Sequence, residues 1–317
     1  MYIHFMVVTK ELVFVDSALG ILHELKTQNP GQHRTWDLTE PRFHYLSIAQ
    51  AQDYLSLVHN KTYASGMHSQ EMDLLQRYAP SIIRSLPDSF AYIDFGPGSG
   101  DKSSILLSEA LRQNKRVAYH GIDISETILT SALSTLSALG LPVRGYVGDF
   151  IRDFTKIRPF IGHQEAFIYF GATFGNFHIQ PILDHLRQTT NSRDRVYVSA
   201  QLQLEDMVSI MDQYRGLESS PLFMQALEQL GFNAENLEQE PRFNSQTHSV
   251  ELCAKVKHVP PLLERIIPGV VRSGDFIVNS MTLKPSKAYF DETVRGFFPK
   301  SELYSTNRFV GAIMEKM

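Results

Sequence analysis

Hydrophobic residues follow two alternating periods along the middle of this chain. Apolar runs of strand length occur at 91–95, 116–124, 144–150, 166–173 and 196–201, and amphipathic stretches of helical length lie between them. The run at 166–173 is apolar at nearly every position, as expected for a strand that is buried on both faces. This alternation predicts an α/β fold with a parallel sheet and helices on both of its sides.

The period changes on either side of this central region. Helical spacing covers residues 11–25, 50–58 and 69–86, before the first predicted strand. Beyond the fifth strand, helices are predicted at 204–214 and 221–230, followed by strands with polar interruptions at 242–259 and 275–283. The last segment is predicted to form a helix at 286–297 and a hairpin of strands at 302–305 and 309–315.

These patterns predict four parts of the chain. We expect residues 1–88 to be the helical N-terminal part of a substrate lobe and residues 89–202 to be a Rossmann-like core. Residues 203–284 are too many for one crossover and are predicted to be a lobe inserted into the sheet. Residues 285–317 would return to the sheet as a helix and a hairpin, which places an antiparallel last strand on a seven-stranded sheet.

The first core strand ends in the string Asp94-Phe95-Gly96-Pro97-Gly98-Ser99-Gly100-Asp101-Lys102-Ser103. Three alternate glycines suit a tight turn from strand to helix, because glycine adopts positive φ and lets a ligand approach the backbone. The Gly-x-x-x-x-Gly-Lys-Ser/Thr phosphate loop is absent, and an acidic strand end before this spacing suits S-adenosylmethionine better than a dinucleotide. A purely structural glycine turn is the alternative.

Acidic residues end three successive predicted strands, at Asp94, Asp123 and Asp149. Since the carboxyl ends of parallel strands meet at one edge of a sheet, a ligand in that crevice would contact all three. We expect Asp94, Gly96 and Gly98 to line the methionine and ribose part of the cofactor. Asp123 would accept both ribose hydroxyls, and Asp149 would take the adenine amino group.

Two further residues are expected at the cofactor. Phe150 offers a stacking face for the adenine, and Lys102 could pair with the cofactor's carboxylate. Each of these side chains also has a structural interpretation. Asp123 could cap a helix, Asp149 could be a turn residue, Phe150 could pack in the core, and Lys102 could be a solvated surface charge.

Composition and charge exclude several classes of protein. The 317 residues are 43% hydrophobic, and the net charge of −4 with interspersed signs argues against nucleic acid as the main partner. The single cysteine, Cys253, suits a reducing cytoplasm. The apolar N-terminus lacks the features of a signal peptide, and no run is long enough to span a membrane. We therefore expect a soluble, cytoplasmic protein, and the twelve histidines show no spacing that predicts a metal site.

The fourth predicted strand ends in Phe170-Gly171-Ala172-Thr173-Phe174-Gly175-Asn176-Phe177. With the glycine string, Asp123-Ile124-Ser125-Glu126 and Gly148-Asp149-Phe150, it resembles the family of the ergothioneine-pathway histidine Nα-methyltransferase and the fungal dimethylallyltryptophan N-methyltransferase. The resemblance is clear over about 90–180 and weaker on both sides. It implies a class I methyltransferase fold, S-adenosylmethionine as cofactor, and methyl transfer to the α-amine of an amino acid.

The resemblance also implies positions for the methyl acceptor. Asn176 and Tyr214 fall where the family holds the acceptor's α-amino and α-carboxylate end, and Tyr63 falls on a pocket tyrosine. Tyr45 matches an N-terminal tyrosine near the cofactor. The acceptor side is completed by four further candidates from two strings: Thr173, Phe177, Asn279 and Ser280. From the residue pattern alone, Asn176 could instead be a helix N-cap.

One string departs from the family pattern. Members that take histidine grip the imidazole with a Glu-x-Ser pair, whereas this chain has Val278-Asn279-Ser280-Met281-Thr282. Ser280 is retained, but the glutamate is replaced by Val278, or by Asn279 if the alignment shifts by one residue. A site that loses its charged partner for the imidazole argues against histidine as the acceptor.

The sequence therefore predicts an S-adenosylmethionine-dependent N-methyltransferase acting on a small amine or amino acid. Two alternatives stay open. One is a protein that binds S-adenosylmethionine or S-adenosylhomocysteine without turnover, as a sensor or partner. The other is a small-molecule O- or C-methyltransferase. The identity of the acceptor, the number of methyl groups transferred and the oligomeric state are not determined by these patterns.

Overall fold

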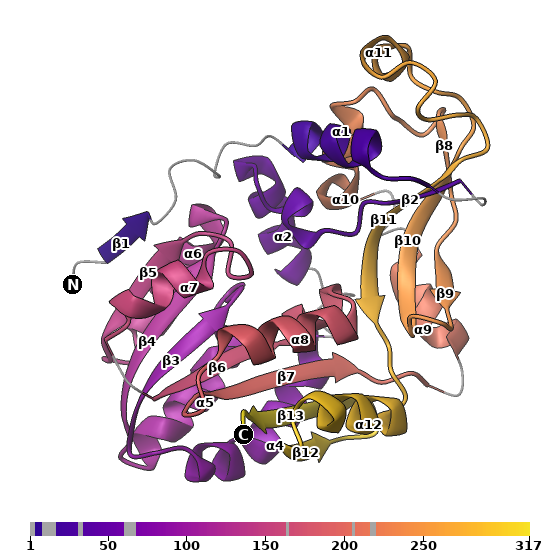
Figure 1. Cartoon of the computed structure of the whole chain (residues 1–317). Helices are drawn as coiled ribbons and strands as arrows, with labels where there is room; N and C mark the ends of the chain where they lie inside the picture. The colour runs from indigo at the N-terminus through magenta and orange to yellow at the C-terminus, as the bar shows by residue number, and fades with distance from the viewer. Residues whose placement is uncertain are drawn as a thin grey trace.

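The main sheet is mixed and has the strand order β1-β5-β4-β3-β6-β7-β13-β12 in the computed structural model (Figure 1), which describes residues 4–7, 17–30, 34–59, 68–162, 165–204, 207–215 and 220–317. Its strands are β1 (His4–Val7), β3 (Ser89–Phe95), β4 (Arg116–Asp123), β5 (Val143–Val147), β6 (Ala166–Gly171), β7 (Arg195–Gln201), β12 (Lys300–Ser305) and β13 (Phe309–Glu315). Neighbours from β1 to β7 are parallel, and β13 is antiparallel to both β7 and β12. The predicted α/β fold with an antiparallel last strand is confirmed.

The N-terminal segment corrects two expectations. β1 pairs with β5 and adds an eighth strand to the seven that were predicted. β2 (Thr35–Asp37) pairs with β11 (Phe276–Leu283) in a second sheet. Residues 1–88 are therefore not wholly helical. Strands this short give no clear periodic signal, because three or four residues do not separate a helical from an extended pattern.

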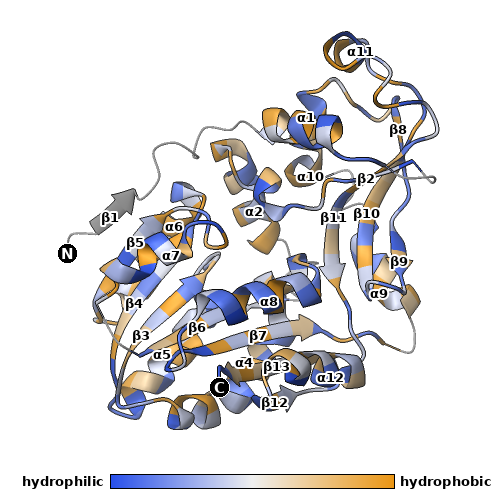
Figure 2. Ribbon diagram, viewed as in Figure 1, coloured by the Kyte–Doolittle hydropathy of each residue, from blue (hydrophilic) through white to orange (hydrophobic). Residues whose placement is uncertain are grey.

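Helices cover both faces of the main sheet. α4 (Ser69–Ser85), α5 (Asp101–Arg112) and α6 (Glu126–Ser137) share one apolar cluster with the sheet. α7 (Phe154–Ile157), α8 (Ile179–Thr189) and α12 (Lys287–Phe297) share the other. α4 thus packs on the core sheet, although its sequence precedes the core. In α8 the buried residues recur at helical spacing, and Figure 2 shows hydrophilic residues on its outer side.

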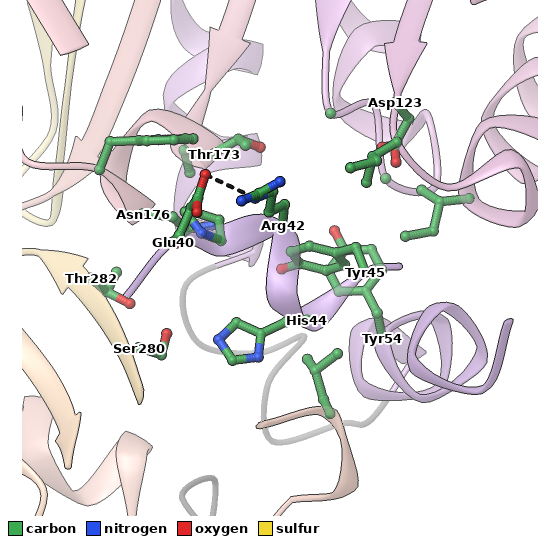
Figure 3. Close-up of a pocket in the computed structure, with 18 of the residues that line it drawn as sticks. Glu40, Arg42, His44, Tyr45, Tyr54, Asp123, Thr173, Asn176, Ser280 and Thr282 are labelled. Atoms are coloured by element: carbon green, nitrogen blue, oxygen red, sulfur yellow. Dashed lines mark ion pairs between the residues drawn. The ribbon is translucent and has the colours of Figure 1, made fainter. Parts of the chain in front are cut away.

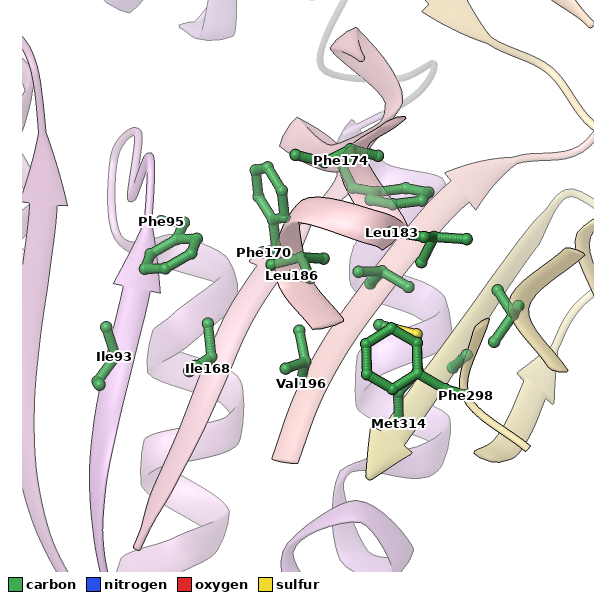
Figure 4. Close-up of a cluster of buried hydrophobic side chains, with 14 of the residues drawn as sticks. Ile93, Phe95, Ile168, Phe170, Phe174, Leu183, Leu186, Val196, Phe298 and Met314 are labelled. Carbon is green, nitrogen blue, oxygen red and sulfur yellow. The ribbon is translucent and has the colours of Figure 1, made fainter. Parts of the chain in front are cut away.

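Alternate strand residues and the buried face of α8 build the core shown in Figure 4. Ile93, Phe95, Ile168 and Phe170 point to the same side of β3 and β6 and pack beneath α8. Phe174 extends this cluster past the end of β6, and it is fully buried. Burying such a side chain contributes roughly 1.5–3 kcal/mol, so Phe174 anchors the turn that carries its neighbours.

The second sheet has the order β2-β11-β10-β8, with β9 also paired to β10. Its remaining strands are β8 (Leu237–Gln239), β9 (Arg242–Asn244) and β10 (Ser249–Val256). α1 (Ser17–Thr27), α10 (Pro221–Glu228) and α11 (Pro261–Ile266) enclose an apolar cluster with it. Trp36 lies in this cluster and donates its indole N–H to Asp275 at 2.9 Å. An N-terminal strand and residues from the 203–284 region therefore share one core.

The division into four parts remains a prediction, although the positions of the elements agree with it after residue 88. α9 (Met207–Tyr214) and α10 follow the main sheet, and α12 with the β12–β13 hairpin returns to it. α2 (Ile48–His59) lies between the two sheets in Figure 1 and contacts both α6 and α10. None of the helices in the described ranges is long and apolar enough to cross a membrane.

Candidate functional site

A pocket lies where the carboxyl ends of the main-sheet strands face the second sheet. Loops after β3, β4 and β5 form one wall, and the turn after β6, the N-terminal segment, α9 and β11 form the other. Figure 3 shows Asp123 at one end of this space and Ser280 with Thr282 at the other. The predicted residues that line it are Tyr45, Gly96, Gly98, Lys102, Asp123, Asp149, Phe150, Thr173, Asn176, Phe177, Tyr214 and Ser280.

The glycine loop forms one edge of the pocket. Gly96 has φ +69° and Gly98 has φ +59°, values that side-chain-bearing residues rarely adopt. A Cβ on Gly98 would lie 2.8 Å from the hydroxyl oxygen of Tyr54. α5 begins at Asp101 directly after this loop. The backbone conformation therefore requires glycine at both positions, and the Tyr54 hydroxyl occupies the space that a side chain at Gly98 would take.

Asp94 does not line the pocket, which corrects its predicted place. Its side chain is buried beneath the loop, and its Oδ2 accepts hydrogen bonds from Ser103 Oγ at 2.5 Å and Tyr119 Oη at 2.9 Å. Burial raises the pKa of Asp94 to about 7, although the two hydroxyl donors oppose the shift. The residue holds α5 to β4, and its strand-end position alone did not reveal that its side chain points into the core.

Asp123 lines the pocket at the end of β4. Its Oδ1 accepts the backbone N–H of Ser125 at 2.8 Å. The N-cap of α6 is Ser125 itself, whose Oγ accepts the N–H of Ile128. The residue that caps α6 is therefore Ser125 and not Asp123. Burial, with a smaller contribution from the Asp94 charge, raises the pKa of Asp123 to about 7.

Asp149 and Phe150 combine the two roles that the sequence left open. Asp149 Oδ1 accepts the backbone N–H groups of Ile151 and Arg152, as a turn residue does, and the residue also lines the pocket. Phe150 stacks on Phe95 with ring centroids 5.2 Å apart and lines the pocket as well. Burial raises the pKa of Asp149, against its backbone donors and the Arg152 charge.

Lys102 lines the pocket from the first turn of α5. Its Nζ lies 2.5 Å from Glu71 Oε2, so it is not a solvated surface charge. About a quarter of its side chain is exposed, whereas Glu71 is fully buried. The ammonium is therefore held at the pocket wall by a carboxylate in the core.

Asn176 and Thr173 reach the pocket from the 3-10 turn η4 (Ala172–Asn176) that follows β6. The N-cap of α8 is His178, so Asn176 is not the helix cap that its sequence position allowed. Thr173 Cγ2 would lie 3.2 Å from a Cβ on Gly96, which brings this turn against the glycine loop. The buried Phe174 between them keeps the turn in place.

The second sheet supplies Ser280 and Thr282, which alternate on β11 and both line the pocket. Asn279, the residue before Ser280, does not line the pocket, contrary to prediction: its Nδ2 donates to the carbonyl of Phe223 at 2.5 Å. Leu252 of β10 pairs with Ser280, and the next residue, Cys253, pairs with Val278. Asn279 is therefore left out of the pairing, as at a β-bulge. Sequence alone did not predict this local irregularity.

Tyr214 stands at the end of α9, almost fully buried, and lines the pocket. The Nζ of Lys284 lies 5.2 Å from the centre of its ring. Tyr214 and Asn176 therefore belong to the same pocket although their elements come from different parts of the fold. Tyr63 lies outside the described residues, and its predicted place stays untested.

Several pocket residues were not predicted, and most belong to the N-terminal segment. Arg42 and His44 belong to the turn η1 (Pro41–His44), Glu40 directly precedes it, and Tyr54 lies on α2. Glu40 Oε1 lies 2.9 Å from Arg42 Nε and 2.6 Å from Arg152 Nη2 (Figure 3 draws the first pair). In the sequence, only Tyr45 and Tyr63 indicated that this segment contributes to the pocket.

His44 is a neutral group on this wall. Burial lowers its pKa to about 4, so the imidazole carries no charge near pH 7. Its Nε2 lies 3.0 Å from the carbonyl oxygen of Asn279, which can only accept, so Nε2 carries the proton. Among the residues that the structure describes, no group of three His, Cys, Asp or Glu side chains could hold a metal ion.

The order of the main sheet, its antiparallel last strand and the pocket at the strand ends are those of the class I methyltransferase fold. The family described as histidine-specific, SAM-dependent methyltransferase matches residues 58–215, about half of the chain. The chain belongs to this family. Members of this family are described as methyltransferases that depend on S-adenosylmethionine.

The chain is also similar to individual proteins. N-methyltransferase dtpB of Aspergillus flavus is 29% identical over 132 residues, which are 38% of this chain and 37% of that protein, so the match spans little more than a third of the relative. The PH0226 protein of Pyrococcus horikoshii is 11% identical with a TM-score of 0.47, over 86% of this chain and 100% of that one. An S-adenosylmethionine-dependent methyltransferase of Clostridium acetobutylicum is 10% identical with a TM-score of 0.42, over 84% and 98%.

Proposed function

We propose that this protein transfers a methyl group to the α-amine of an amino acid or of a small molecule derived from one, and that histidine itself is not the acceptor. The observation that carries this proposal is a single pocket with two unlike walls. One wall consists of strand-end residues suited to the cofactor, and the other brings Asn176 and Tyr214 together with Ser280 and Thr282.

On the cofactor side, each residue has a role that its chemistry supports. The buried carboxylate of Asp123 would accept the ribose hydroxyls, and its position at the end of β4 suits that task. Asp149 would accept from the adenine amino group while Phe150 lies against the ring. Lys102 would pair with the carboxylate of the cofactor's amino-acid end. Tyr45 and Tyr54, whose rings lie 5.4 Å apart, would close the space over the glycine loop.

On the acceptor side, Asn176 and Tyr214 would hold the α-amino and α-carboxylate groups. An amide offers both donors and an acceptor, and a phenol offers one of each, so the pair can satisfy both ends of an amino acid. The N–H of Phe177 is bonded to Phe174 within the η4 turn, which keeps Asn176 at a fixed place on the wall. The name of the fungal relative, an N-methyltransferase, agrees with nitrogen as the acceptor atom.

S-Adenosylmethionine, when bound, supplies a methyl group on an electron-poor sulfonium. The protein's task is then chiefly geometric: it must hold a neutral amine in line with that methyl group. Holding two reactants in near-attack geometry contributes on the order of 7 kcal/mol or more to lowering the barrier. Asn176 and Tyr214 can orient the amine lone pair, and a bound amine can release its proton to water, so no strong base is needed.

The far end of the acceptor wall favours a neutral side chain. Its two hydroxyls, Ser280 and Thr282, carry no charge, and the adjacent His44 is neutral. Glu40, the acidic residue on the N-terminal side of the pocket, is engaged by two arginines. A site built for imidazole would offer a carboxylate there, and without one the discrimination in favour of histidine is lost.

The proposal is tested by mixing the purified protein with labelled S-adenosylmethionine and a panel of amino acids, their derivatives and non-amine acceptors. We expect methylated amine and S-adenosylhomocysteine in equal amounts, with histidine a poor acceptor. Methylation of an oxygen or carbon acceptor, with no amine accepted, would overturn the assignment. Affinity for the cofactor without any turnover would indicate a binding protein instead.

A further inference from the structure

A fully buried carboxylate lies directly behind the cofactor wall, in a place that the reaction does not explain. Glu71, on α4, has no exposed surface. Its Oε1 accepts hydrogen bonds from Ser199 Oγ at 2.7 Å, from the Ala172 backbone N–H at 2.8 Å and from Tyr169 Oη at 3.0 Å. One oxygen of the carboxylate is thus held by three donors from β6, β7 and η4.

The other oxygen faces the pocket wall. Oε2 lies 2.5 Å from Lys102 Nζ, with which it forms an ion pair. Burial acts to raise the pKa of Glu71, but the Lys102 charge and the hydrogen bonds outweigh it, so the pKa lies below its ordinary value. An ionised carboxylate in the core is expensive without a partner, and Lys102 is therefore required close to it.

The turn after β6 is built around this carboxylate. Gly171 has φ +48°, and a Cβ there would lie 2.7 Å from Tyr169 Oη and 2.9 Å from Glu71 Oε1. Only glycine leaves room for both groups while the next N–H bonds to Oε1. The carboxylate therefore cannot move without disturbing three elements, β6, β7 and η4.

We propose that Glu71 is a positioning residue for the cofactor. Its carboxylate, fixed by three hydrogen bonds, holds the Lys102 ammonium at the cofactor wall, where the carboxylate of the bound cofactor would lie. This inference rests on the proposed function, because it requires Lys102 to meet that carboxylate. A lysine side chain loses rotamer entropy when it is ordered, and Glu71 would order it before the ligand arrives.

The test compares two ligands that differ in the group Lys102 would contact. S-Adenosylhomocysteine carries the carboxylate, and 5′-methylthioadenosine lacks it. Glu71→Gln keeps the size of the side chain and its acceptor oxygen but presents an amide to Lys102. By calorimetry we expect this variant to bind S-adenosylhomocysteine about tenfold more weakly and 5′-methylthioadenosine within twofold of the unaltered protein.

The selective loss of affinity for S-adenosylhomocysteine in Glu71→Gln should depend on the presence of Lys102. Lys102→Met is expected to show the same ligand-selective loss, and adding Glu71→Gln to it should cause no further selective loss. Asp194→Asn is the matched control, because Asp194 is also buried and pairs with Arg158 at 3.0 Å but does not line the pocket. It should lower thermal stability without changing either affinity. If Glu71→Gln does not fold, Glu71→Asp retains the charge but shortens its reach, and it should show the same selectivity.

Three results would overturn the inference: unchanged or tighter binding of S-adenosylhomocysteine, equal losses for both ligands, or an undiminished effect in the Lys102→Met background. Failure of the unaltered protein to bind either ligand would overturn the proposed function, and this inference with it. Normal binding by the unaltered protein, with Glu71→Gln unaffected, would overturn the inference alone.

Discussion

The two walls of the pocket are constructed in different ways. On the cofactor wall, Gly96, Asp123 and Asp149 each follow a strand of one parallel sheet, within a continuous stretch of the chain. The acceptor wall takes Glu40 from an N-terminal segment, Tyr214 from α9 and residues of β11 from a second sheet.

The difference in construction corresponds to two tasks: binding a cofactor that many enzymes share, and recognising one particular acceptor. Binding a common cofactor needs groups at fixed places on one rigid sheet edge, and consecutive strand-to-helix turns provide them. Recognising an acceptor needs a shape enclosed from several sides, which only distant segments can provide. If the two walls are functionally distinct, substitutions on one should leave the other largely intact.

The largest effect is expected from Asp123→Ala on the cofactor wall. Removing a buried carboxylate that accepts hydroxyl donors should weaken S-adenosylhomocysteine binding by about 10- to 100-fold, measured by calorimetry. Asp88→Ala, at an exposed aspartate outside the pocket, is the control and should bind normally. Normal binding by the Asp123 variant would show that the ribose lies elsewhere.

Asn176→Ala tests the other wall. It should leave the affinity for S-adenosylhomocysteine within twofold and lower kcat/KM for the amine acceptor at least tenfold, because a hydrogen-bonding group that orients the acceptor is lost. The two values come from calorimetry and from initial rates with an acceptor identified in the panel. A matching loss of cofactor affinity would mean that the two walls are misassigned.

The pKa of Asp123 gives the cofactor wall a pH dependence. Its carboxyl has a pKa of about 7 without ligand, and the ionised form is the one that accepts both ribose hydroxyls. Affinity for S-adenosylhomocysteine should therefore fall by up to about tenfold between pH 8 and pH 6. Asp123→Asn should flatten this dependence, and a profile that is identical in both proteins would refute the explanation.

Ser280→Glu should sharpen the comparison by changing specificity alone. A carboxylate on the acceptor wall would offer a partner to imidazole, so relative kcat/KM for histidine should rise about fivefold while cofactor affinity is retained. Thr282→Glu, two residues further on the same face of β11, shows which position faces the side chain of the acceptor. No gain from either variant would place that side chain away from β11.

The smallest effect concerns a surface pair that joins the two regions. His178 Nε2 lies 3.7 Å from Asp37 Oδ2, and the hydrogen bond to Asp37 raises the His178 pKa against burial. The stabilisation is present below the ordinary histidine pKa and is lost as pH rises through the raised value. Both side chains are largely exposed and screened, so Asp37→Asn should cost no more than about 0.5 kcal/mol. Thermal unfolding at pH 5.5 and pH 8.5 should show a loss only at the lower pH.

Sequence by itself determined the alternation of strands and helices, the glycine loop and the antiparallel hairpin that ends the main sheet. These follow from local rules: hydrophobic period, turn chemistry and capping act over a few residues. The strand-end positions of Asp123 and Asp149 belong to the same group.

Only the tertiary structure decided where several side chains point. Asp94 is turned into the core by Ser103 and Tyr119, and Asn279 is turned out of the pocket by a bulge. Glu71 lies behind Lys102 because α4 packs on a sheet that it precedes in sequence. Such placements depend on the register and packing of segments far apart in the chain, and no local pattern specifies them.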